Sequence, residues 1–517
     1  MTMKKILAII VLGLAFAATS CSNFFELKRP NQFPWQSASE FEMAVRAPYL
    51  YYVGAAWANP IGALTNRFGE SDLARYTNKT GDSYFFAYWN RTYKTEVLDN
   101  YKELEGGFEY LYYMSSACNS ALELIENAEA NGTDPFPNMT AADKETVKRY
   151  KGELLFMRAF TYWNLARTWC PPYNDQTKDS KHIVVYRHNE KNSDVLKNGT
   201  LSTVQEVYDY ILEDLKDAIA ILPEDYNPGD PGKRMRANKY AAEALLARVL
   251  FYMGNFSEAK TYIDDVISKT DLYELDTDLV APFNRTTSTA TSKEVVWEIT
   301  YSDASDRYDR NPGIMQYAAY NGHANKMCGY CAFSLSYYAM EKVGWLDAAS
   351  HNPTAEATGD LRFQNLYKFH PGGEGDSYPE PAIFLFKYFR GATETDNGRR
   401  ASRPMIRLAD LYLMRAQINL ATNPTAATAD VNVVRNRAGL ANVAAATEEI
   451  IENERIKELA GENADRIYWL CALHKDIPLG DRATDGTNGE VIRYPYSDYY
   501  YQIPLLERQS NKAYEEN

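Results

Sequence analysis

The chain has 517 residues, of which 45% are hydrophobic and 24% charged, a composition typical of an ordinary folded globular protein. Its formal net charge of −14 argues against nucleic acid as a partner. Six cysteines in a chain of this length do not form the dense framework of a small disulfide-rich protein. Tyrosine is abundant, with 40 residues, and tyrosine rings serve both in cores and in binding surfaces.

The first 20 residues have the pattern of an export signal. Lys4 and Lys5 precede the apolar residues 6–18, a stretch too short for a stable transmembrane helix. Small residues directly precede Cys21, as in a bacterial lipobox, where the cysteine is acylated and becomes the new N-terminus. Cleavage of an ordinary signal peptide nearby is the alternative. We expect lipidation at Cys21.

The chain divides into three predicted parts. Residues 1–20 form the lipoprotein signal peptide, residues 21–36 form the lipid anchor and tether, and residues 37–517 form a single helical domain. Length alone would favour about three domains. Helix-pair patterns nevertheless recur along the whole chain, and they indicate one helical body with loops built onto it.

Periodic apolar residues predict most of the helices. The first covers about residues 37–52 and contains Pro48, which predicts a kink. Ser202 and Gln205 have the spacing of a capping box at the start of another helix. The further predicted helices cover residues 108–131, 144–169, 201–222, 334–343, 446–460 and 465–473. Residues 294–301 read as a strand, and residues 493–511 read as an extended aromatic tail.

A helical hairpin is predicted at residues 238–273. Gly254 and Asn255 end its first helix, and Ser257 can cap the second. Small residues stand where the helices approach each other, Ala247 on the first and Ala259 on the second. This arrangement is similar to a tetratricopeptide repeat, and one such hairpin cannot bury its apolar face alone. Comparable patterns occur at residues 153–169 and 408–440.

Two long segments, about residues 60–92 and 302–333, are irregular and rich in polar and aromatic residues. Loops of this length are uncommon unless they are functional or disordered, and the aromatic content argues against disorder. Sugar binding needs aromatic faces for the pyranose ring and polar groups for its hydroxyls. The alternative is that these aromatics only pack the loops onto the body. The candidate ligand-binding residues are Asp72, Arg75, Tyr84, Trp89 and Asn90, followed by Tyr308, Tyr317, Tyr320, Asn321 and His323.

The remaining cysteines predict no catalytic chemistry. Cys328 and Cys331 have redox-motif spacing, but the strand and helix of a thioredoxin setting are absent from the pattern. A local disulfide and two plain thiols both stay open. Cys118, Cys170 and Cys471 fall in predicted helices, where we expect them to be buried.

We predict neither a cofactor nor a catalytic motif. The chain contains no H-E-x-x-H, G-x-S-x-G or Walker pattern. Residues 481–490 are acidic and glycine-rich but lack EF-hand spacing, and Asp303, Asp306 and Asp309 give no better pattern. Structural calcium therefore stays an alternative to solvated loop acids, and no metal ligand is assigned.

Several motifs, in this order along the chain, resemble the SusD/RagB family of outer-membrane lipoproteins. Residues 69–72 (GESD) are similar to its early acidic segment. The others are residues 152–172 (GELLFMRAFTYWNLARTWCPP), 201–223, the hairpin at 238–273, 404–416 (PMIRLADLYLMRA), 431–440 (VNVVRNRAGL), 454–462 (ERIKELAGE) and 501–504 (YQIP).

The resemblance implies a mainly α fold, with a tetratricopeptide-like scaffold, long irregular loops and a few short strands. It implies a lipid-anchored outer-membrane protein that faces the cell surface and is not an enzyme. Such a protein captures oligosaccharide or polysaccharide for a SusC-like TonB-dependent transporter, with ligand contacts from loops at about the two segments above. A peptide-binding member, a ligand-free structural lid and a glycoside hydrolase are the alternatives.

Overall fold

A computed structural model of the chain describes residues 35–53, 60–77, 83–92, 102–190, 196, 198–225, 234–283, 292–299, 320–321, 326–327, 332–374, 378–387, 403–482 and 489–514. The predicted signal at residues 1–20 and the predicted lipidation site Cys21 lie outside these ranges, so both stay predictions.

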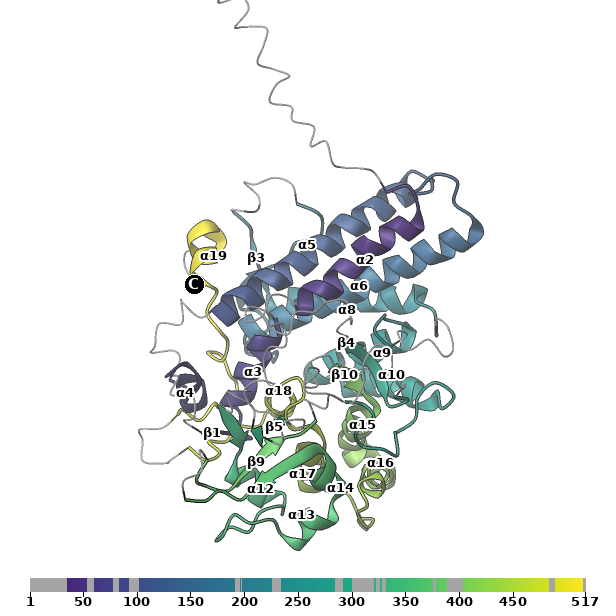
Figure 1. Cartoon of the computed structure of the whole chain (residues 1–517). Helices are drawn as coiled ribbons and strands as arrows, with labels where there is room; N and C mark the ends of the chain where they lie inside the picture. Colours follow the sequence, from purple (N-terminus) through teal and green to yellow (C-terminus); the bar gives the residue numbers. More distant parts are fainter. Residues whose placement is uncertain are drawn as a thin grey trace, which may run out of the picture.

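Helices dominate the described chain, and the strands are short (Figure 1). The helices are α2 (Ala38–Val53), α3 (Pro60–Glu70), α4 (Ser83–Asn90), α5 (Lys102–Ala130), α6 (Ala141–Trp169), α8 (Val204–Ile221), α9 (Lys239–Tyr252), α10 (Phe256–Ser268), α12 (Tyr337–Lys342), α13 (Ala355–Gly359), α14 (Leu361–Leu366), α15 (Leu408–Thr422), α16 (Pro424–Arg437), α17 (Glu448–Leu459), α18 (Asp465–Ala472), α19 (Leu505–Ser510) and the 3₁₀ turn η3 (Lys512–Tyr514). The predicted mainly α fold is confirmed. None of the helices in the described ranges combines the length and apolar character that crossing a bilayer requires.

The strands form small antiparallel sheets. One sheet has four strands in the order β1-β7-β9-β8, and the pairs β10-β4, β2-β3 and β5-β6 form the others. The strands are β1 (Ala74–Tyr76), β2 (Lys181–Val184), β3 (Leu201–Thr203), β4 (Val295–Ile299), β5 (Tyr320–Asn321), β6 (Lys326–Met327), β7 (Phe333–Leu335), β8 (Tyr367–His370), β9 (Ala382–Leu385) and β10 (Arg403–Arg407). The predicted strand at residues 294–301 is confirmed as β4. The helix predicted to begin at residue 334 begins only at Tyr337, because β7 takes the residues before it.

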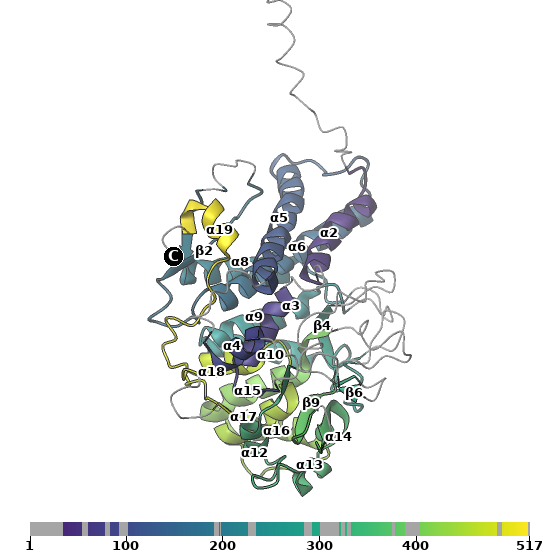
Figure 2. The same cartoon turned by 60° about the vertical axis from the view of Figure 1, so that its left-hand side comes forward.

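The helices pack in a series of neighbouring pairs. Helix α6 packs against α5, α2 and α8, and α5 and α6 lie beside α2 at one end of the body (Figures 1 and 2). Helix α8 packs against α9, α9 pairs with α10, and α10 packs against α15, which pairs with α16. Such a series is what a repeat scaffold requires, since each pair needs a neighbour to cover its apolar face. The closer likeness to tetratricopeptide repeats stays a prediction.

The predicted central hairpin is present as α9 and α10. Asn238 caps α9 by accepting a hydrogen bond from the Ala241 N–H at 2.8 Å. Gly254 ends that helix in the left-handed region, with φ of 79°. Ala247 and Ala259 are fully buried where small residues were expected. The predicted Ser257 cap is wrong, since α10 starts at Phe256 and its N-cap residue makes no side-chain hydrogen bond.

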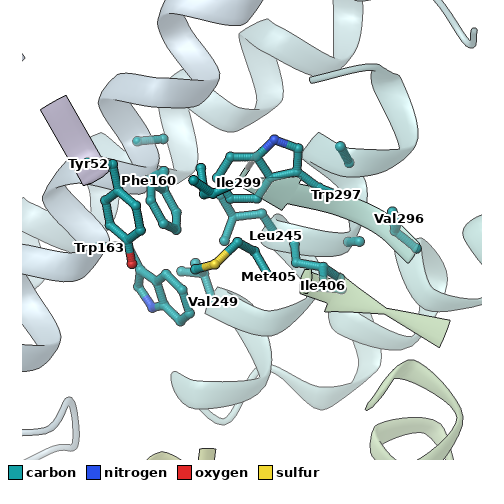
Figure 3. Packing of buried hydrophobic residues seen from close by; sticks show 14 of the residues in the cluster. Tyr52, Phe160, Trp163, Leu245, Val249, Val296, Trp297, Ile299, Met405 and Ile406 are labelled. Atoms are coloured by element: carbon teal, nitrogen blue, oxygen red, sulfur yellow. The ribbon is translucent and has the colours of Figure 1, made fainter. Parts of the chain in front are cut away.

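The main core lies between α6, α9 and the pair of strands β4 and β10 (Figure 3). The Trp297 ring meets Phe156 and Phe160 edge to face, with both centroid distances 4.8 Å. The Trp297 indole nitrogen is satisfied by donating to the Met235 carbonyl at 3.1 Å. Burying large aromatic side chains supplies much of a core's stability, and their satisfied polar atoms fix the orientation of the rings.

The prediction of an irregular segment over residues 60–92 is wrong. This segment folds into α3, β1 and α4. Residues 71–73 connect α3 to β1, and residues 77–82 connect β1 to α4; of these, residues 78–82 lie outside the described ranges. Phe68 and Leu64 on α3 and Phe85 and Tyr88 on α4 are buried, so these short helices are stabilised by packing. Helix α4, with 8 residues, has too few turns for a helical period to show in the sequence, whereas α3, with 11 residues, reaches the length at which a period can be recognised.

Two helix boundaries also differ from the expectations. The capping box of α8 is made by Thr203 and Glu206, one residue later than predicted, because α8 begins at Val204 directly after β3. The Thr203 hydroxyl accepts from the Glu206 N–H at 3.1 Å, and the Glu206 carboxylate accepts from the Thr203 N–H at 2.7 Å. The tail predicted as extended contains α19 and η3 within residues 493–511 and just beyond.

Helix α17 carries a set of buried charges that reaches several other elements. The Glu458 carboxylate accepts from Arg407 on β10 at 2.6 Å and also from Arg437 on α16. Although burial raises the pKa of Glu458, Arg437, Arg407 and Arg362 outweigh it and hold the pKa well below its usual range. The Glu458 carboxylate is therefore ionised. It links α17 to β10 through Arg407, to α16 through Arg437 and to α14 through Arg362.

A second branch of these charges leads from α17 to the segment around β1. Glu452 accepts from Arg466 at 2.9 Å, and Arg466 in turn donates two hydrogen bonds to Asp72, at 2.9 and 2.7 Å. Burial raises the pKa of Glu452, but Arg466, Lys342 and Lys475 outweigh it and lower the pKa to about 2. Charged pairs this well buried are costly to break, because the remaining partner stays desolvated.

Gly254→Ala should lower the free energy of unfolding by about 1 kcal/mol, because an L-residue is strained at positive φ. No atom lies within 4 Å of the added Cβ, so backbone strain is the sole expected cost. Urea denaturation monitored by circular dichroism measures the change. Gly254→Asn is the matched control and should cost less, since asparagine tolerates the left-handed region. Equal stability of the alanine variant and the original chain would contradict the hairpin geometry.

Glu452→Gln should lower the free energy of unfolding by about 2 kcal/mol near pH 7, after allowance for solvent screening. The folded pKa lies below the unfolded value of about 4.3, so the ionised group stabilises the fold above that pH. This contribution disappears as the pH falls toward the folded value of about 2. The difference between the variant and the original chain should therefore shrink between roughly pH 5 and pH 3.

Urea denaturation at several pH values measures this difference. Glu145→Gln is the control, since Glu145 is exposed on α6 and the same charge is removed far from α17. A difference that stays constant from pH 7 to pH 3 would show that the Glu452 carboxylate is not held ionised by its partners.

Candidate ligand-binding site

The two segments predicted to bind ligand meet as neighbouring strands. Strand β1 from the first segment pairs antiparallel with β7 at the end of the second, with Arg75 opposite Ser334 and Tyr76 opposite Phe333. The Thr77 N–H extends this pairing by donating to the Ala332 carbonyl at 2.9 Å. The fold thus brings together two regions that are more than 200 residues apart in the sequence.

An aromatic surface lies beside this strand pair. Helix α4 buries Phe85 and Tyr88 on its inner face, and Phe86 and Trp89, also three residues apart, share another face. Phe86 is 39% exposed, and Trp89 and Tyr76 are half-buried. The ring centroids of Tyr76 lie 5.4 Å from Phe86 and 6.3 Å from Trp89, and Phe86 lies 6.0 Å from Trp89. We refer to Tyr76, Phe86 and Trp89 as the aromatic platform.

Hydrogen bonds of the Trp89 side chain and backbone hold the platform in place. The Trp89 indole nitrogen donates to the Ala74 carbonyl at 2.9 Å, which links α4 to β1. Arg482 donates to the carbonyls of Trp89, Leu479 and Gly69, the last two at 2.6 and 3.0 Å. Its guanidinium also lies 5.3 Å from the Trp89 ring centroid. The tryptophan is therefore held in one orientation.

Gly69 allows the close packing beneath the platform. A Cβ at this position would lie 2.7 Å from the Phe333 ring, so any side chain would push β7 away from α3. Next to it, the buried Glu70 accepts hydrogen bonds from Arg67 at 3.1 Å and from the Tyr499 hydroxyl at 2.7 Å. The GESD motif thus positions the strand that carries the site.

Arg75 lies at the edge of the site in a stack of three flat groups. Its guanidinium lies 4.1 Å from the Tyr337 ring centroid, and the His351 ring stacks on Tyr337 at 3.7 Å. Arg75 also pairs with Glu380, which is 62% exposed, and lies 3.9 Å from Asp481. These contacts fix the Arg75 side chain, which is partly accessible.

Asp481 accepts hydrogen bonds at the N-terminus of α12. Its two carboxylate oxygens accept from the N–H groups of Tyr337 and Tyr338 at 2.8 and 2.7 Å. Burial raises the pKa of Asp481 above its ordinary value, although those N–H groups and Arg75 oppose this shift. This side chain was considered above for calcium, but its two oxygens are engaged by the backbone. The described residues contain no group of three or more His, Cys, Asp or Glu side chains that could hold a metal ion.

The predicted residues of the first segment have different positions. Arg75 and Trp89 lie at the surface as expected, whereas Asp72 is fully buried and both of its oxygens bind Arg466. Asp72 therefore holds the fold and is closed to a ligand in this structure. Asn90 is 5% exposed and its Oδ1 has no hydrogen-bond partner among the described residues. Tyr84 lies on α4, and its side chain is not among those described.

The predicted residues of the second segment are mostly outside the described ranges. Tyr320 and Asn321 form strand β5, which pairs with β6 in a short hairpin, and their side chains are not described. Tyr308, Tyr317 and His323 lie outside the described residues, as do Cys328 and Cys331. Cys118, Cys170 and Cys471 are buried, as predicted, and all three are free thiols.

The sequence did not single out Tyr76, Phe86, Tyr337 and His351 as site residues. Phe86 could have been found from its spacing to Trp89, had residues 83–90 been assigned as a helix. No local signal connects Tyr337 or His351 to Arg75, since they are neighbours only in the folded chain.

Two family models match this chain. A model described as "Starch-binding associating with outer membrane" (SusD-like) matches residues 55–251, and one described as "SusD family" (SusD/RagB) matches residues 371–469. The two matches together cover more than half of the 517 residues and include both the platform and helix α17. No curated protein matches the chain.

Solved structures share the whole fold. A SusD superfamily protein from Bacteroides thetaiotaomicron VPI-5482 has 19% identity and a TM-score of 0.73, with 92% of this chain and 98% of that chain covered. A putative sugar binding protein from Bacteroides vulgatus ATCC 8482 has 19% identity and a TM-score of 0.70, with 93% and 98% covered. A laminarin binding SusD-like protein has 19% identity and a TM-score of 0.66, with 92% and 98% covered.

Because these identities are low, the structural likeness establishes the fold and nothing further about this chain. Sequence motifs, family models and fold nevertheless agree over most of the chain. The chain belongs to the SusD/RagB family.

Proposed function

We propose that this chain binds a glycan at the aromatic platform and delivers it for import across the outer membrane. The observation that carries this proposal is the group of three adjacent, partly accessible rings of Tyr76, Phe86 and Trp89. Aromatic faces of this kind suit the C–H face of a pyranose, and Arg75 at the edge offers guanidinium donors to hydroxyls. Asn90 is 5% exposed, so we do not include it among the proposed ligand contacts.

Rigidity supports binding at this position. The platform is fixed to β1 through Trp89 and to residues 479–482 through Arg482, and Asp72 is fixed to α18 through Arg466. A preformed surface loses little conformational entropy when a ligand binds. Three adjacent rings offer room for more than one sugar unit, which suits a stretch of an oligosaccharide or polysaccharide.

Binding without turnover fits the acids near the platform. Glycoside hydrolysis needs two carboxyl groups free to face the scissile bond. Asp481 is engaged by two backbone N–H groups, and Glu380 pairs with Arg75. We propose that bound glycan is released intact; cleavage products from a purified preparation would favour the hydrolase alternative.

Location and partner complete the proposal. Acylation at Cys21 would hold the chain on the outer membrane, in line with the family description of outer-membrane association. We propose that the domain, tethered by residues 21–36, faces the cell surface next to a SusC-like TonB-dependent transporter. The family description names starch, and one structural relative is named as laminarin binding, so both glycans are first choices for testing.

Phe86→Ala should weaken glycan binding about tenfold, the effect of losing one stacking contact of about 1.4 kcal/mol. Adding Trp89→Ala should abolish measurable binding. Affinity gels containing starch, laminarin and a panel of other polysaccharides, run with the chain from residue 22 onward, measure the change.

Tyr51→Ala is the control, since this tyrosine is 38% exposed on α2, away from the platform. Unchanged binding by the double variant would move the site elsewhere. If the original chain binds no polysaccharide in the panel, the glycan proposal fails, and peptide capture or the structural-lid alternative takes its place.

Cys21→Ser should abolish lipid attachment. In cells that express the full chain with its signal, the original protein should incorporate labelled palmitate and sediment with membranes. The serine variant should do neither, because a hydroxyl cannot form the thioether to the lipid. Labelling of the variant at the same level would rule out Cys21 as the anchor and favour the ordinary signal peptide.

A further inference from the structure

A second concave surface lies apart from the aromatic platform. It is a pocket of about 510 Å³ between the first half of α5, residues 186–190 and helix α19. This volume falls within the range of small-molecule sites. In both views α19 lies beside α5, whereas α4 lies further along the body (Figures 1 and 2). The pocket shares no lining residue with the platform.

Aromatic rings in fixed orientations form one wall of the pocket. The Tyr112 hydroxyl donates to the Val184 carbonyl at 2.8 Å, and the Tyr186 hydroxyl donates to the Leu196 carbonyl at 3.3 Å. Their ring centroids are 5.9 Å apart with a 73° angle between the planes, and Phe108 lies 4.8 Å from Tyr112. Since both hydroxyls are engaged, these side chains offer a ligand their rings.

Carboxylates stand around these rings, and the one basic side chain in the described lining is the exposed His188. Among the described residues that line the pocket, none is lysine or arginine. Glu507 is half-buried and accepts a hydrogen bond from the Asn511 amide at 3.2 Å, and Glu109 accepts from the Tyr113 hydroxyl. Burial raises the pKa of Glu507. The four lining carboxylates are Glu105, Glu109, Glu190 and Glu507.

We propose that this pocket binds a small ligand that carries a protonated primary amine on a polar body. The amine would meet the carboxylates and the ring faces, both of which attract a cation in a partly desolvated site. The exposed Ser116 and the amide oxygen of Asn189, whose nitrogen donates to Glu123 at 2.9 Å, supply polar groups for the rest of the ligand. An amino sugar and the amino end or lysine of a short peptide share this chemistry. The proposal does not depend on glycan binding at the platform.

Isothermal titration of the chain from residue 22 onward tests this proposal with three probes. They are the β-1,4-linked disaccharide of glucosamine, its di-N-acetylated form and a lysine-containing dipeptide. The glucosamine disaccharide, the dipeptide or both should bind, and the acetylated sugar, which has no charged amine, should bind at least tenfold more weakly. The tighter of the two amines identifies the source of the ligand.

Two pairs of variants localise the binding. Glu105→Gln with Glu507→Gln should weaken amine binding at least tenfold, and 0.5 M salt should weaken it as well. Glu145→Gln, which removes an exposed charge near the start of α6, should leave it unchanged. Thermal melting of each variant verifies the fold. The double variant Phe86→Ala, Trp89→Ala should also leave amine binding unchanged. Failure of the glycan proposal at the platform is therefore distinguishable from failure of the amine proposal at this pocket.

Three results would overturn the proposal. They are equal binding of the acetylated and free-amine disaccharides, retention of amine binding in the folded Glu105→Gln, Glu507→Gln variant, and absence of saturable binding of any amine probe at 10 mM.

Discussion

Paired charges buried along helix α17 are the constraint on which the arrangement of the other elements depends. Glu452, Glu454, Arg455, Lys457 and Glu458 are all buried on this one helix. A buried charge costs several kcal/mol unless a partner meets it with good geometry. Arg455 meets Asp410 on α15 and Asp465 on α18, while Glu458 meets Arg407 on β10. Each partner comes from a different element, so α17 has one position in which its charges are satisfied, and that position fixes α15, α18 and β10 around it.

The same set of charges reaches the proposed ligand-binding site. Glu452 orients Arg466, and Arg466 holds the carboxylate of Asp72 at the turn between α3 and β1. Strand β1 then carries Arg75 and Tyr76, and its pairing with β7 brings the second predicted segment alongside. A chain of ionic and hydrogen-bonded contacts thus runs from the interior to the aromatic platform. The connection begins at Glu452 on α17, just before the motif at residues 454–462, and ends at Asp72 in the acidic motif at residues 69–72.

Local signals in the sequence were sufficient where a structure is determined by neighbours along the chain. The hairpin α9–α10 was predictable because Asn238, the apolar spacing and Gly254 mark its boundaries. Helix α4 was not, because eight residues, five of them aromatic, show no helical period, and its stability comes from burying Phe85 and Tyr88. Asp72 was predicted as a ligand contact because its structural partner could not be seen in the sequence. That partner, Arg466, is 394 residues away, and no sequence pattern connects the two. Arg75 and Trp89 were selected from residue chemistry alone and stay predicted ligand contacts, whereas the stack of Tyr337 and His351 on Arg75 exists only in the folded chain.

The central claim is that a rigid aromatic platform, fixed by buried charges, receives a glycan. A crystal structure of the chain from residue 22 onward, soaked with the oligosaccharide that binds best, tests this claim most directly. We expect a pyranose ring lying against Phe86 and Trp89, with a hydroxyl within hydrogen-bond distance of Arg75, and an intact glycosidic chain. Sugar bound elsewhere on the molecule, with the Tyr76, Phe86 and Trp89 rings left uncovered, would contradict it.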